Sequence, residues 1–365
     1  MNILHLEASS GWGGQEMRIL REAEGMRKRG HAVFFAVMKG GALAKEARKA
    51  GFTAYEVGFQ RSGWLICLFQ LLRIFRRHGI DLVNTHSSLD SWIGGIAARC
   101  AGKKILRTRH LSTASKPGWN SRILYGKLAD FVVTTCSAAA EAIAKETGGS
   151  KFRSVPTGVE PEKVLVQLGG VGVFRKEWGI AEGDFLVGTA CFMRSWKGID
   201  DLLGAAHLLR ERRKIKWVVI GGGHAERHLK KAKELNLDGI VFFTGHLSNP
   251  FPALASLDAF ALLSTAHEGV SQAILQAAFL SKPLIATPTG GLGEVCLDGK
   301  TGIQVPIFSP EKVAQAVLRL QANPALCEQF GRGAYELVMK RFTFQETLNE
   351  MEQVYRSILK ESNIV

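Results

Sequence analysis

The stretch Leu262-Leu-Ser-Thr-Ala-His-Glu-Gly-Val-Ser-Gln-Ala-Ile-Leu-Gln-Ala-Ala-Phe-Leu280 joins a short apolar strand, a polar break and an amphipathic helix. The strand is expected over 258–263 and the break over 264–267. The helix is expected to begin near Glu268 and end near Leu280, because apolar residues then recur on one face. That face consists of Ile274, Leu275, Ala278 and Phe279. A strand that leads directly into a helix is the building unit of a parallel α/β sheet.

A helix that begins at the carboxyl end of a strand presents free N–H groups and a partial positive charge. Such a terminus suits a phosphate, or negative charge that develops on a leaving group. Glu268 stands at the mouth of this expected site. Gln276 lies eight residues further on, about 12 Å along a helix axis at 1.5 Å per residue. The two polar side chains are therefore placed to hold the two ends of one extended ligand.

Length and composition indicate a globular protein of more than one domain. The chain has 365 residues, of which 46% are hydrophobic and 22% charged, so two or three domains can each bury a core. The bulkiest apolar run of the first half, 64–69, is far shorter than the roughly 18 residues of a membrane-spanning helix. The N-terminal residues are expected to form the first strand, and they lack the basic leader and cleavage site of a signal peptide.

The cysteines indicate a reducing compartment. The six cysteines are Cys67, Cys100, Cys136, Cys191, Cys296 and Cys327. They form no C-x-x-C pair and no short pairing, which argues against a metal site and favours reduced thiols. The protein is therefore expected to be cytoplasmic.

Positive charge is concentrated in the first half of the chain. Residues 1–163 hold 25 Lys and Arg against 13 Asp and Glu, whereas residues 164–365 hold 22 against 20. The net charge of +14 therefore divides into +12 and +2. A basic half favours an anionic partner, either nucleic acid or anionic lipid.

Two runs of alternating strands and helices organise the chain. In the first run, strands are expected over 2–7, 31–37, 55–57, 81–85, 104–108 and 131–136, and an amphipathic helix over 64–78. The periodicity weakens over 160–172, which is the candidate linker. In the second run, strands are expected over 185–190, 217–221, 240–243, 258–263 and 284–286, and a terminal helix over 345–361. Strands separated by helices imply parallel sheets with helices on both faces.

Several short motifs have both a functional and a structural interpretation. Gly13 and Gly14 follow the first strand and permit close backbone approach to a ligand, but the spacing is not G-x-G-x-x-G and a tight turn is an equal alternative. Arg194 and Lys197 follow a strand and can clamp a diphosphate, with solvated surface charge as the alternative. His110 ends a strand at the edge where open α/β sheets bind ligands, with a structural histidine as the alternative.

Taken in their order along the chain, the motifs resemble those of retaining glycosyltransferases that have the GT-B fold and belong to the glycosyltransferase family 4 type. The matching segments are Gly13-Gly-Gln-Glu-Met-Arg-Ile-Leu20, Arg27-Lys-Arg-Gly-His31, Asp81-Leu-Val-Asn-Thr-His-Ser-Ser88, Val155-Pro-Thr-Gly-Val159, Arg194-Ser-Trp-Lys-Gly198, Phe243-Thr-Gly245, Glu268-Gly269 with Leu275-Gln-Ala277, Ala286-Thr-Pro-Thr-Gly-Gly291 and Asp298-Gly-Lys-Thr-Gly302. The resemblance covers nearly the whole chain and is most specific in the second half. It implies α/β architecture with two Rossmann-like parallel-sheet domains that face a central cleft. The acceptor-side domain would be 1–163, the nucleotide-sugar domain 164–342, and a C-terminal helix over 343–365 would pack back on the first.

The resemblance also implies roles for individual residues. The catalytic set would be Glu268, His110, Arg194 and Lys197, in which the two cations hold the donor's diphosphate, Glu268 contacts sugar hydroxyls and His110 faces the sugar ring. The donor would further contact Gly13, Gly14, Leu247, Gly269, Val270 and Gln276. The acceptor side would include Gln15, His86 and Arg109. Relatives of this type need no metal, so the expected co-substrate is a nucleotide-diphosphate sugar without a metal or other cofactor.

One residue departs from the family pattern. The family's E-x7-E motif ends in a second acid that grips the ribose diol, and this chain has Gln276 at that position. An amide can bond one hydroxyl, but it cannot accept from both hydroxyls as a carboxylate can. Gln276 is therefore expected to change how the nucleotide is bound and not to prevent catalysis, because the ribose contact is distant from the reacting carbon.

The resulting hypothesis is a cytoplasmic enzyme that transfers a sugar from a nucleotide-diphosphate donor to an acceptor hydroxyl with retention of configuration. The basic first half predicts reversible docking on the cytoplasmic face of an anionic membrane, and an acceptor in lipopolysaccharide or another cell-surface glycan. Two alternatives remain at this stage. One is a nucleotide-sugar 2-epimerase of the same fold, and the other is a non-catalytic sugar-nucleotide binder or nucleic-acid scaffold. Nucleic acid is the weaker partner, because the basic segments are not interleaved with aromatic residues.

Overall fold

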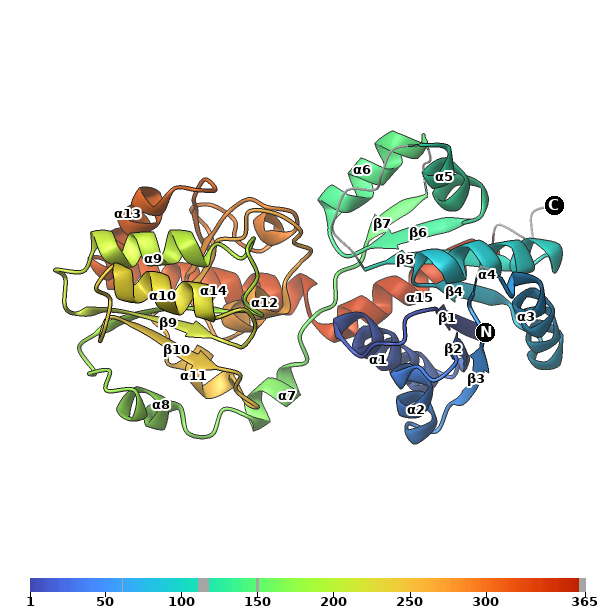
Figure 1. Ribbon diagram of the computed structural model, residues 1–365, viewed down its shortest axis with the longest axis horizontal. Helices are drawn as coiled ribbons and strands as arrows, with labels where there is room; N and C mark the ends of the chain where they lie inside the picture. Colours follow the sequence, from blue (N-terminus) through green and yellow to red (C-terminus); the bar gives the residue numbers. More distant parts are fainter. Residues whose placement is uncertain (61, 111–117, 149–150, 361–365) are drawn as a thin grey trace. The chain divides into compact units, whose positions relative to one another are not determined.

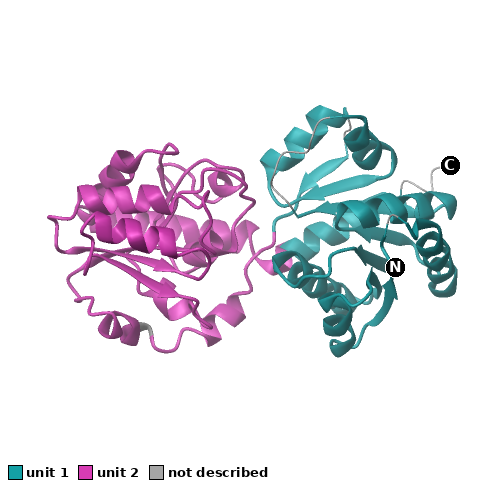
Figure 2. Ribbon diagram, viewed as in Figure 1, with its two compact units in different colours: residues 1–156, 347–365 teal, residues 157–346 magenta. Residues whose placement is uncertain are grey.

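The chain divides into two compact units (Figure 2). The computed structural model describes residues 1–60, 62–110, 118–148 and 151–360. Unit 1 combines Met1–Pro156 with Thr347–Val365, and unit 2 is Thr157–Glu346. Each unit contains one parallel sheet flanked by helices (Figure 1), so the expected pair of α/β domains is confirmed.

Seven strands form the sheet of unit 1, in the order β3-β2-β1-β4-β5-β6-β7. The strands are β1 Asn2–Glu7, β2 Ala32–Met38, β3 Thr53–Val57, β4 Leu82–Thr85, β5 Lys104–Arg109, β6 Phe131–Thr134 and β7 Phe152–Ser154. The helices are α1 Gly14–Lys28, α2 Ala42–Lys49, α3 Trp64–His78, α4 Ser88–Cys100, α5 Trp119–Ser121, the π-helical η1 Arg122–Lys127, α6 Ser137–Thr147 and α15 Phe344–Lys360. β1 is central and buried on both faces, since Ile3, Leu4 and Leu6 have no solvent contact. This explains why the strands read as continuous apolar runs.

Six strands form the sheet of unit 2, in the order β10-β9-β8-β11-β12-β13. The strands are β8 Phe185–Ala190, β9 Ile215–Ile220, β10 Val241–Gly245, β11 Ala259–Leu262, β12 Leu284–Ala286 and β13 Gly302–Gln304. The helices are α7 Pro161–Val166, α8 Val171–Glu177, α9 Ile199–Leu208, α10 Glu226–Glu234, α11 Phe251–Ala255, α12 Gln272–Phe279, the 3-10 helix η2 Leu292–Glu294, α13 Pro310–Gln321 and α14 Pro324–Arg341. Trp217 on β9 is completely buried and anchors the core between this sheet and its helices.

The expected helix start at Glu268 is wrong. Helix α12 begins at Gln272, with Ser271 as its N-cap in extended conformation. His267 has a positive φ of 58°, and the N–H of Gly291 donates to the carbonyl of Glu268 at 3.3 Å. These constraints hold 264–271 as a loop, so the N–H groups of Gly269 and Val270 belong to a loop instead of a helix terminus. The apolar face of α12 is confirmed, because Ile274, Leu275, Ala278 and Phe279 are all buried.

Smaller elements differ from what the sequence pattern shows. Residues 119–127 form one turn of α5 followed by the π-helical η1. The short strand β13 was not expected, because a three-residue strand carries too few apolar positions to show a period. The candidate linker over 160–172 contains α7 and the start of α8.

The chain crosses between the units near residue 156, earlier than the expected boundary at 163. Val159 and Thr343 form a parallel bridge inside unit 2, in which Val159 N–H donates to the carbonyl of Phe342 at 2.8 Å and Phe344 N–H donates to Val159 at 2.7 Å. Helix α15 contributes to unit 1 from Thr347 onward, and the expected residues 361–365 lie outside the described part of the chain. Among the described residues, no helix is both long and apolar enough to span a membrane.

A buried polar cluster ties α15 to the rest of unit 1. The hydroxyl of Tyr355 donates to Glu22 on α1 and accepts from Asn84 on β4 at 3.1 Å. Arg18 on α1 donates to the carbonyl of Val155 at 2.6 Å. Burial raises the pKa of Glu22 and of Tyr355 and lowers that of Arg18. These side chains are buried together, so the cluster depends on all of its hydrogen bonds.

We predict that Tyr355→Phe destabilises the protein, because Glu22 and Asn84 each lose a buried partner. The expected loss is about 1–3 kcal/mol in the free energy of unfolding, measured by urea denaturation followed by circular dichroism. Tyr335→Phe is the matched control, since Tyr335 on α14 is partly exposed. Equal urea midpoints for the two variants would show that the cluster does not stabilise the fold.

Candidate functional site

The sheet of unit 2 has its topological switch point between β8 and β11. The chain continues from β8 to β9 and β10 on one side, whereas β11, β12 and β13 extend the sheet on the other side. All of the pairings are parallel, so the carboxyl ends of the strands lie at one edge. Open α/β sheets bind their ligands at this edge, where the strand order reverses.

Lys197 and Glu268 meet at the switch point. Lys197 lies in the loop after β8 and Glu268 in the loop after β11, and their side chains form an ion pair. The hydroxyl of Ser264 also donates to Glu268 Oε1, at 2.7 Å. Glu268 is 5% exposed and Ser264 is completely buried. The carboxylate is therefore held in one orientation, and the ammonium group of Lys197 retains donors for an anionic ligand.

Two glycines allow the backbone to close around this pair. Gly198 has φ 68°, and a Cβ there would lie 2.0 Å from the carbonyl oxygen of Leu263. Gly290 has φ 57°, and a Cβ there would lie 1.8 Å from the carbonyl oxygen of Glu268. Side chains cannot occupy either position without moving the backbone. The motifs Arg194-Ser-Trp-Lys-Gly198 and Thr287-Pro-Thr-Gly-Gly291 are thus explained by close packing of the loops around Glu268.

Hydrogen bonds outside the expected residues complete the loop scaffold. Thr287 Oγ1 donates to the carbonyl of Ser264 at 2.6 Å, and Thr265 N–H donates to the carbonyl of Trp196 at 2.8 Å. The rings of Trp196 and His267 meet edge to face at 5.3 Å. Sequence reasoning missed Ser264 and Thr287 as supports of Glu268. The available signal was their position directly after β11 and β12.

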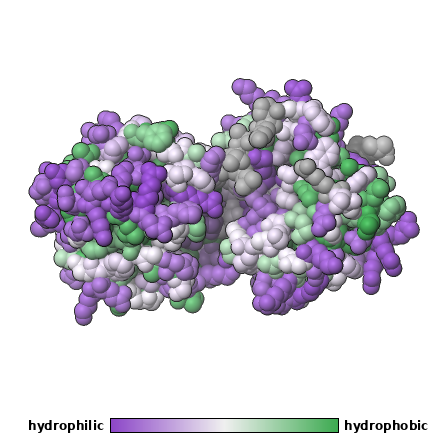
Figure 3. Space-filling model, viewed as in Figure 1, coloured by the Kyte–Doolittle hydropathy of each residue, from purple (hydrophilic) through white to green (hydrophobic). Residues whose placement is uncertain are grey.

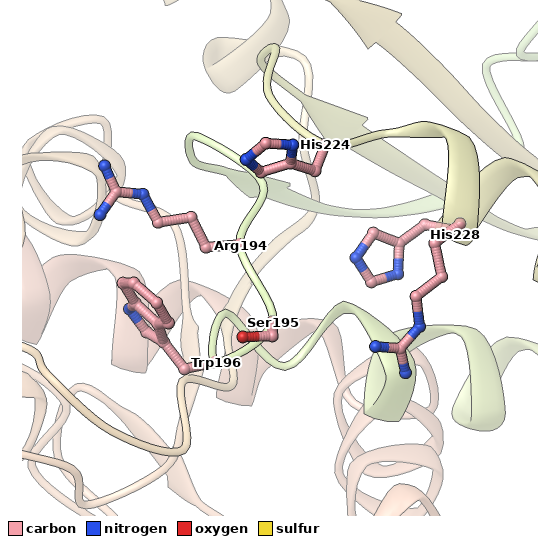
Figure 4. Close-up of a pocket in the computed structure, with 6 residues that line it drawn as sticks. Arg194, Ser195, Trp196, His224 and His228 are labelled. Carbon is pink, nitrogen blue, oxygen red and sulfur yellow. The ribbon is translucent and has the colours of Figure 1, made fainter.

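Arg194 lies apart from the buried ion pair, on the wall of a neighbouring pocket of about 450 Å³. The lining residues are Arg194, Ser195, Trp196, His224, Arg227 and His228 (Figure 4). The guanidinium of Arg194 stacks over the rings of Phe192 and Trp196 at 5.4 and 5.2 Å. Arginine stacked on aromatic rings is pre-organised to bind an anion with its free edge. The expected two-cation clamp is therefore spread over two environments, one buried and one lining a pocket.

Charges on α9 and α10 shape the far side of this pocket. Asp200 pairs with Arg227 and with Lys231, each at 2.9 Å. Burial lowers the pKa of His228, so this ring is neutral at physiological pH. The charge of Arg227 is thus partly neutralised by Asp200, and Arg194 supplies positive charge on the opposite wall.

The other residues of unit 2 that were expected to contact the donor lie in loops after the strands or on α12. Leu247 is half-buried in the loop after β10, and Gln276 is half-buried in the middle of α12. Val270 is buried and Gly269 lies beside it in the loop. Because Glu268 precedes the helix, its separation from Gln276 is not a simple helical rise. The structure brings Glu268 and Lys197 into contact and leaves Gln276 on a separate element.

In unit 1, the expected acceptor-side residues surround the carboxyl ends of β1, β4 and β5. Gly13 is the N-cap of α1, and its N–H donates to Glu16 Oε2 at 2.9 Å. Gly14 is the first residue of α1. Gln15 donates to Glu7 at the end of β1. Arg109 donates to the hydroxyl of Tyr125 at 2.5 Å.

A chain of three histidines runs from the core of unit 1 to this edge. His5 Nδ1 and His86 Nε2 are 2.9 Å apart, and His86 Nδ1 and His110 Nε2 are also 2.9 Å apart. Burial lowers the pKa of His5 to about 3. Burial, followed by neighbouring positive charge, holds the pKa of His86 and of His110 well below its ordinary value. All three rings are therefore neutral at pH 7, and each N···N contact contains one shared proton.

Two buried acids lie beside the histidine chain. Burial raises the pKa of Glu7 to about 7 and that of Asp90 to about 6. Arg107 on β5 lies 3.9 Å from Asp90. Sequence reasoning missed His5 and Glu7, which point to the same face of β1 because they are two residues apart. Two polar residues at this spacing in an otherwise apolar strand could have indicated a functional role for His5 and Glu7.

Comparison with known proteins agrees with this architecture. Residues 12–163 match the sequence profile described as Glycosyltransferase Family 4, and residues 185–323 match that of Glycosyl transferases group 1. The chain is 24% identical over 312 residues to the capsular polysaccharide biosynthesis glycosyltransferase CapM of Staphylococcus aureus, with 81% of each chain covered. It is 26% identical over 176 residues to a glycosyltransferase of Methanocaldococcus jannaschii, MJ1069, and this match covers 46% of the chain and 45% of that relative. The chain thus spans less than half the length of that curated relative.

The fold is shared with solved structures. The crystal structure of Anabaena Alr3699/HepE in complex with UDP superposes with a TM-score of 0.84 at 20% identity, and the match covers 98% of this chain and 100% of that one. The two sequence profiles cover separate stretches of the chain, the first mostly in unit 1 and the second entirely in unit 2. The chain therefore belongs to the GT-B glycosyltransferases, with a glycosyltransferase family 4 domain followed by a glycosyl transferases group 1 domain.

Proposed function

We propose that the protein transfers a sugar from a nucleotide-diphosphate donor to an acceptor hydroxyl and retains the anomeric configuration. The observation that carries this proposal is the buried Lys197–Glu268 pair at the switch point of unit 2. A cation beside a carboxylate matches a donor that presents phosphate next to sugar hydroxyls. The relative Alr3699/HepE, which shares the fold, was solved with UDP, which supports a nucleoside diphosphate as the ligand.

In the proposed reaction, negative charge develops on the departing phosphate. An ammonium group has three N–H donors, so Lys197 can bind this phosphate while it remains bonded to Glu268. Arg194, stacked on Phe192 and Trp196, would contact the other phosphate. Preorganised cations stabilise developing charge because they do not reorganise during the step. Here the positive charge comes from side chains, and we propose that no metal ion is needed.

Glu268 would accept hydrogen bonds from hydroxyls of the transferred sugar. Ser264 and Lys197 both bond to its Oε1, so the orientation of the carboxylate is determined before the donor binds. A carboxylate in a fixed orientation would align the sugar, so that the acceptor hydroxyl attacks the face from which the phosphate leaves. The leaving phosphate would take the proton of that hydroxyl. Leu247 would contact the base and Gln276 the ribose, and the amide of Gln276 would hydrogen-bond to one ribose hydroxyl.

Unit 1 would supply the acceptor side and close on the donor. His110 would face the sugar ring, and Gly13 and Gly14 would approach the phosphates through their backbone. Gln15, His86 and Arg109 would line the acceptor side. His86 and His110 are neutral, so they would act as hydrogen-bonding groups instead of cations. Closure of the two units around the donor would exclude water and limit hydrolysis.

We also propose that the acceptor belongs to a cell-surface glycan such as lipopolysaccharide. CapM acts in capsular polysaccharide biosynthesis according to its name, and the net charge of +12 in residues 1–163 suits an anionic membrane surface. The protein would then be cytoplasmic and peripherally bound to the membrane. A 2-epimerase and a non-catalytic binder remain the alternatives that an activity assay separates.

A panel of nucleotide sugars tests activity on the donor. Incubation with a panel of nucleotide sugars, in the presence of EDTA, should release free sugar slowly from one donor, because glycosyltransferases hydrolyse their donor at a low rate without acceptor. Mass spectrometry detects the products. Interconversion of two nucleotide sugars would instead identify an epimerase, and an unchanged panel would identify a binder. Hydrolysis that EDTA abolishes would contradict the metal-free mechanism.

Glu268→Gln should reduce sugar release at least about 30-fold, which corresponds to about 2 kcal/mol of lost transition-state stabilisation. Affinity for the nucleoside diphosphate should stay the same or increase, because Lys197 loses a competing negative charge. Glu336→Gln is the control, since Glu336 is exposed on α14. Turnover within about threefold of wild type would remove Glu268 from the catalytic set.

Lys197→Ala and Arg194→Ala should weaken a nucleoside diphosphate about 10- to 100-fold, as expected for a lost charge-assisted hydrogen bond. The unphosphorylated nucleoside should bind almost as in wild type. Lys197→Ala should have the larger effect, because Lys197 is more buried and less screened by solvent. Lys214→Ala, at the opposite edge of the sheet, is the control. Calorimetry that finds equal losses for nucleoside and diphosphate would rule out the phosphate contacts.

A further inference from the structure

Helix α3 has two apolar faces, and only one of them packs against unit 1. Its buried residues are Cys67, Leu71, Ile74 and Phe75. The first half of the helix exposes a second apolar set, in which Ile66 and Phe69 are each 68% exposed, Leu65 51% and Trp64 41%. The apolar residues of α3 therefore divide into a buried set and an exposed set. Four large apolar side chains with this exposure on two helical turns are typical of an interaction surface.

A pocket opens beside this exposed face. It has a volume of about 520 Å³ and lies between the start of α3, helix α4 and α5. Its lining residues are Trp64, Ser88, Leu89, Trp92, Ile93, Ile96 and Asn120. Trp119, next to Asn120, is 73% exposed. Figure 3 shows hydrophobic surface over the part of unit 1 where Figure 1 places α3 and α4. The pocket and the exposed face thus form one apolar surface.

Positive charge borders this surface. Arg73, Arg76 and Arg77 are exposed on the second half of α3, and Arg122 and Lys127 are exposed on η1. An apolar surface with tryptophans and a cationic border matches the interface of an anionic membrane, where acyl chains meet charged headgroups. A soluble protein partner would have to be acidic and apolar in the same places. The combination of charge and apolar pocket therefore favours lipid.

We propose that the pocket between α3, α4 and α5 binds one hydrocarbon chain of an anionic lipid while Arg73, Arg76 and Arg77 contact the phosphates. This proposal rests on the proposed function, in that the lipid would be the anchor of the acceptor glycan. It goes further than surface docking, because the protein would recognise the lipid tail itself. Trp64 and Trp92 would line the chain, and Ile66 and Phe69 would enter the leaflet beside it.

Two sets of variants separate chain binding from surface docking. Ile96→Trp fills the pocket and leaves every surface arginine in place, and Leu229→Trp on α10 of unit 2 is its size-matched control. The triple variant Arg73→Gln, Arg76→Gln and Arg77→Gln removes the charged border. Arg212→Gln, Arg213→Gln and Lys214→Gln, exposed in unit 2, form the charge-matched control.

Calorimetry with dihexanoyl-phosphatidylglycerol below its micelle concentration tests the pocket. Wild type and Leu229→Trp should bind this monomeric lipid with equal affinity, and Ile96→Trp should lose at least about tenfold. Glycerol phosphate, which has the headgroup charge without the chains, should not bind measurably. Equal binding by wild type and Ile96→Trp would overturn the pocket proposal, as would the absence of binding to wild type.

Co-sedimentation with phosphatidylglycerol vesicles tests the charged border. The triple arginine variant should lose on the order of 100-fold in vesicle affinity at low salt, since each cation contributes roughly fivefold, whereas the unit 2 control should bind as wild type does. Vesicle docking without monomer binding would overturn the pocket and leave surface docking in place. Self-association that Ile66→Ser and Phe69→Ser abolish, without lipid binding, would identify a dimer interface and overturn the proposal.

Donor hydrolysis by the same proteins keeps the two proposals distinct. Ile96→Trp alters unit 1 and lies far in sequence from the Lys197–Glu268 pair, so its rate of sugar release should equal that of wild type. If lipid binds as expected and wild type hydrolyses no donor, the transferase function fails and the lipid site stands. If donor is hydrolysed and lipid does not bind, the lipid site alone fails.

Discussion

The ion pair between Lys197 and Glu268 is the interaction on which the proposed donor site of this protein depends. It joins the loop after β8 to the loop after β11, the two strands that flank the switch point of unit 2. Gly198 and Gly290 are required because backbone carbonyls occupy the space where their side chains would be. Ser264 donates a hydrogen bond to the same carboxylate oxygen. A buried pair of this kind contributes little net stability, and we infer that it is present because of the charge pattern that it offers a ligand.

Unit 1 contains buried histidines and acids at the carboxyl edge of its sheet. Its central strand β1 carries His5 and Glu7 near its carboxyl end. His86 hydrogen-bonds to His5 and to His110, each with an N···N distance of 2.9 Å. The rings are neutral because burial disfavours their charged form. The acids beside them take up protons near neutral pH for the same reason. The carboxyl edge of this sheet therefore combines neutral histidines with acids that titrate near neutral pH, whereas Arg73, Arg76 and Arg77 are exposed on α3.

The strand and helix order of both units could be predicted from hydrophobic periodicity, because buried parallel strands and amphipathic helices each have a distinct pattern. Sequence reasoning placed Glu268 at a helix start, and the structure places it in a loop because His267 adopts a positive φ and Gly290 packs on its backbone. The Gly290 contact comes from a segment more than twenty residues away, which local sequence patterns do not reveal. Lys197 and Arg194 were predicted as one clamp, but tertiary packing directs one to Glu268 and the other to an aromatic pocket. His5 was missed because its hydrogen-bond partner, His86, is 81 residues further along the chain.

The central claim is that unit 2 binds the donor's diphosphate around Lys197 and Glu268. Hydrogen–deuterium exchange with mass spectrometry, in the absence and presence of a saturating nucleoside diphosphate, tests it most directly. The account predicts slower exchange in peptides that cover 193–198 and 264–272, the two loops that the ion pair joins. Protection confined to unit 1, or to the sheet edge at β13, would contradict the account.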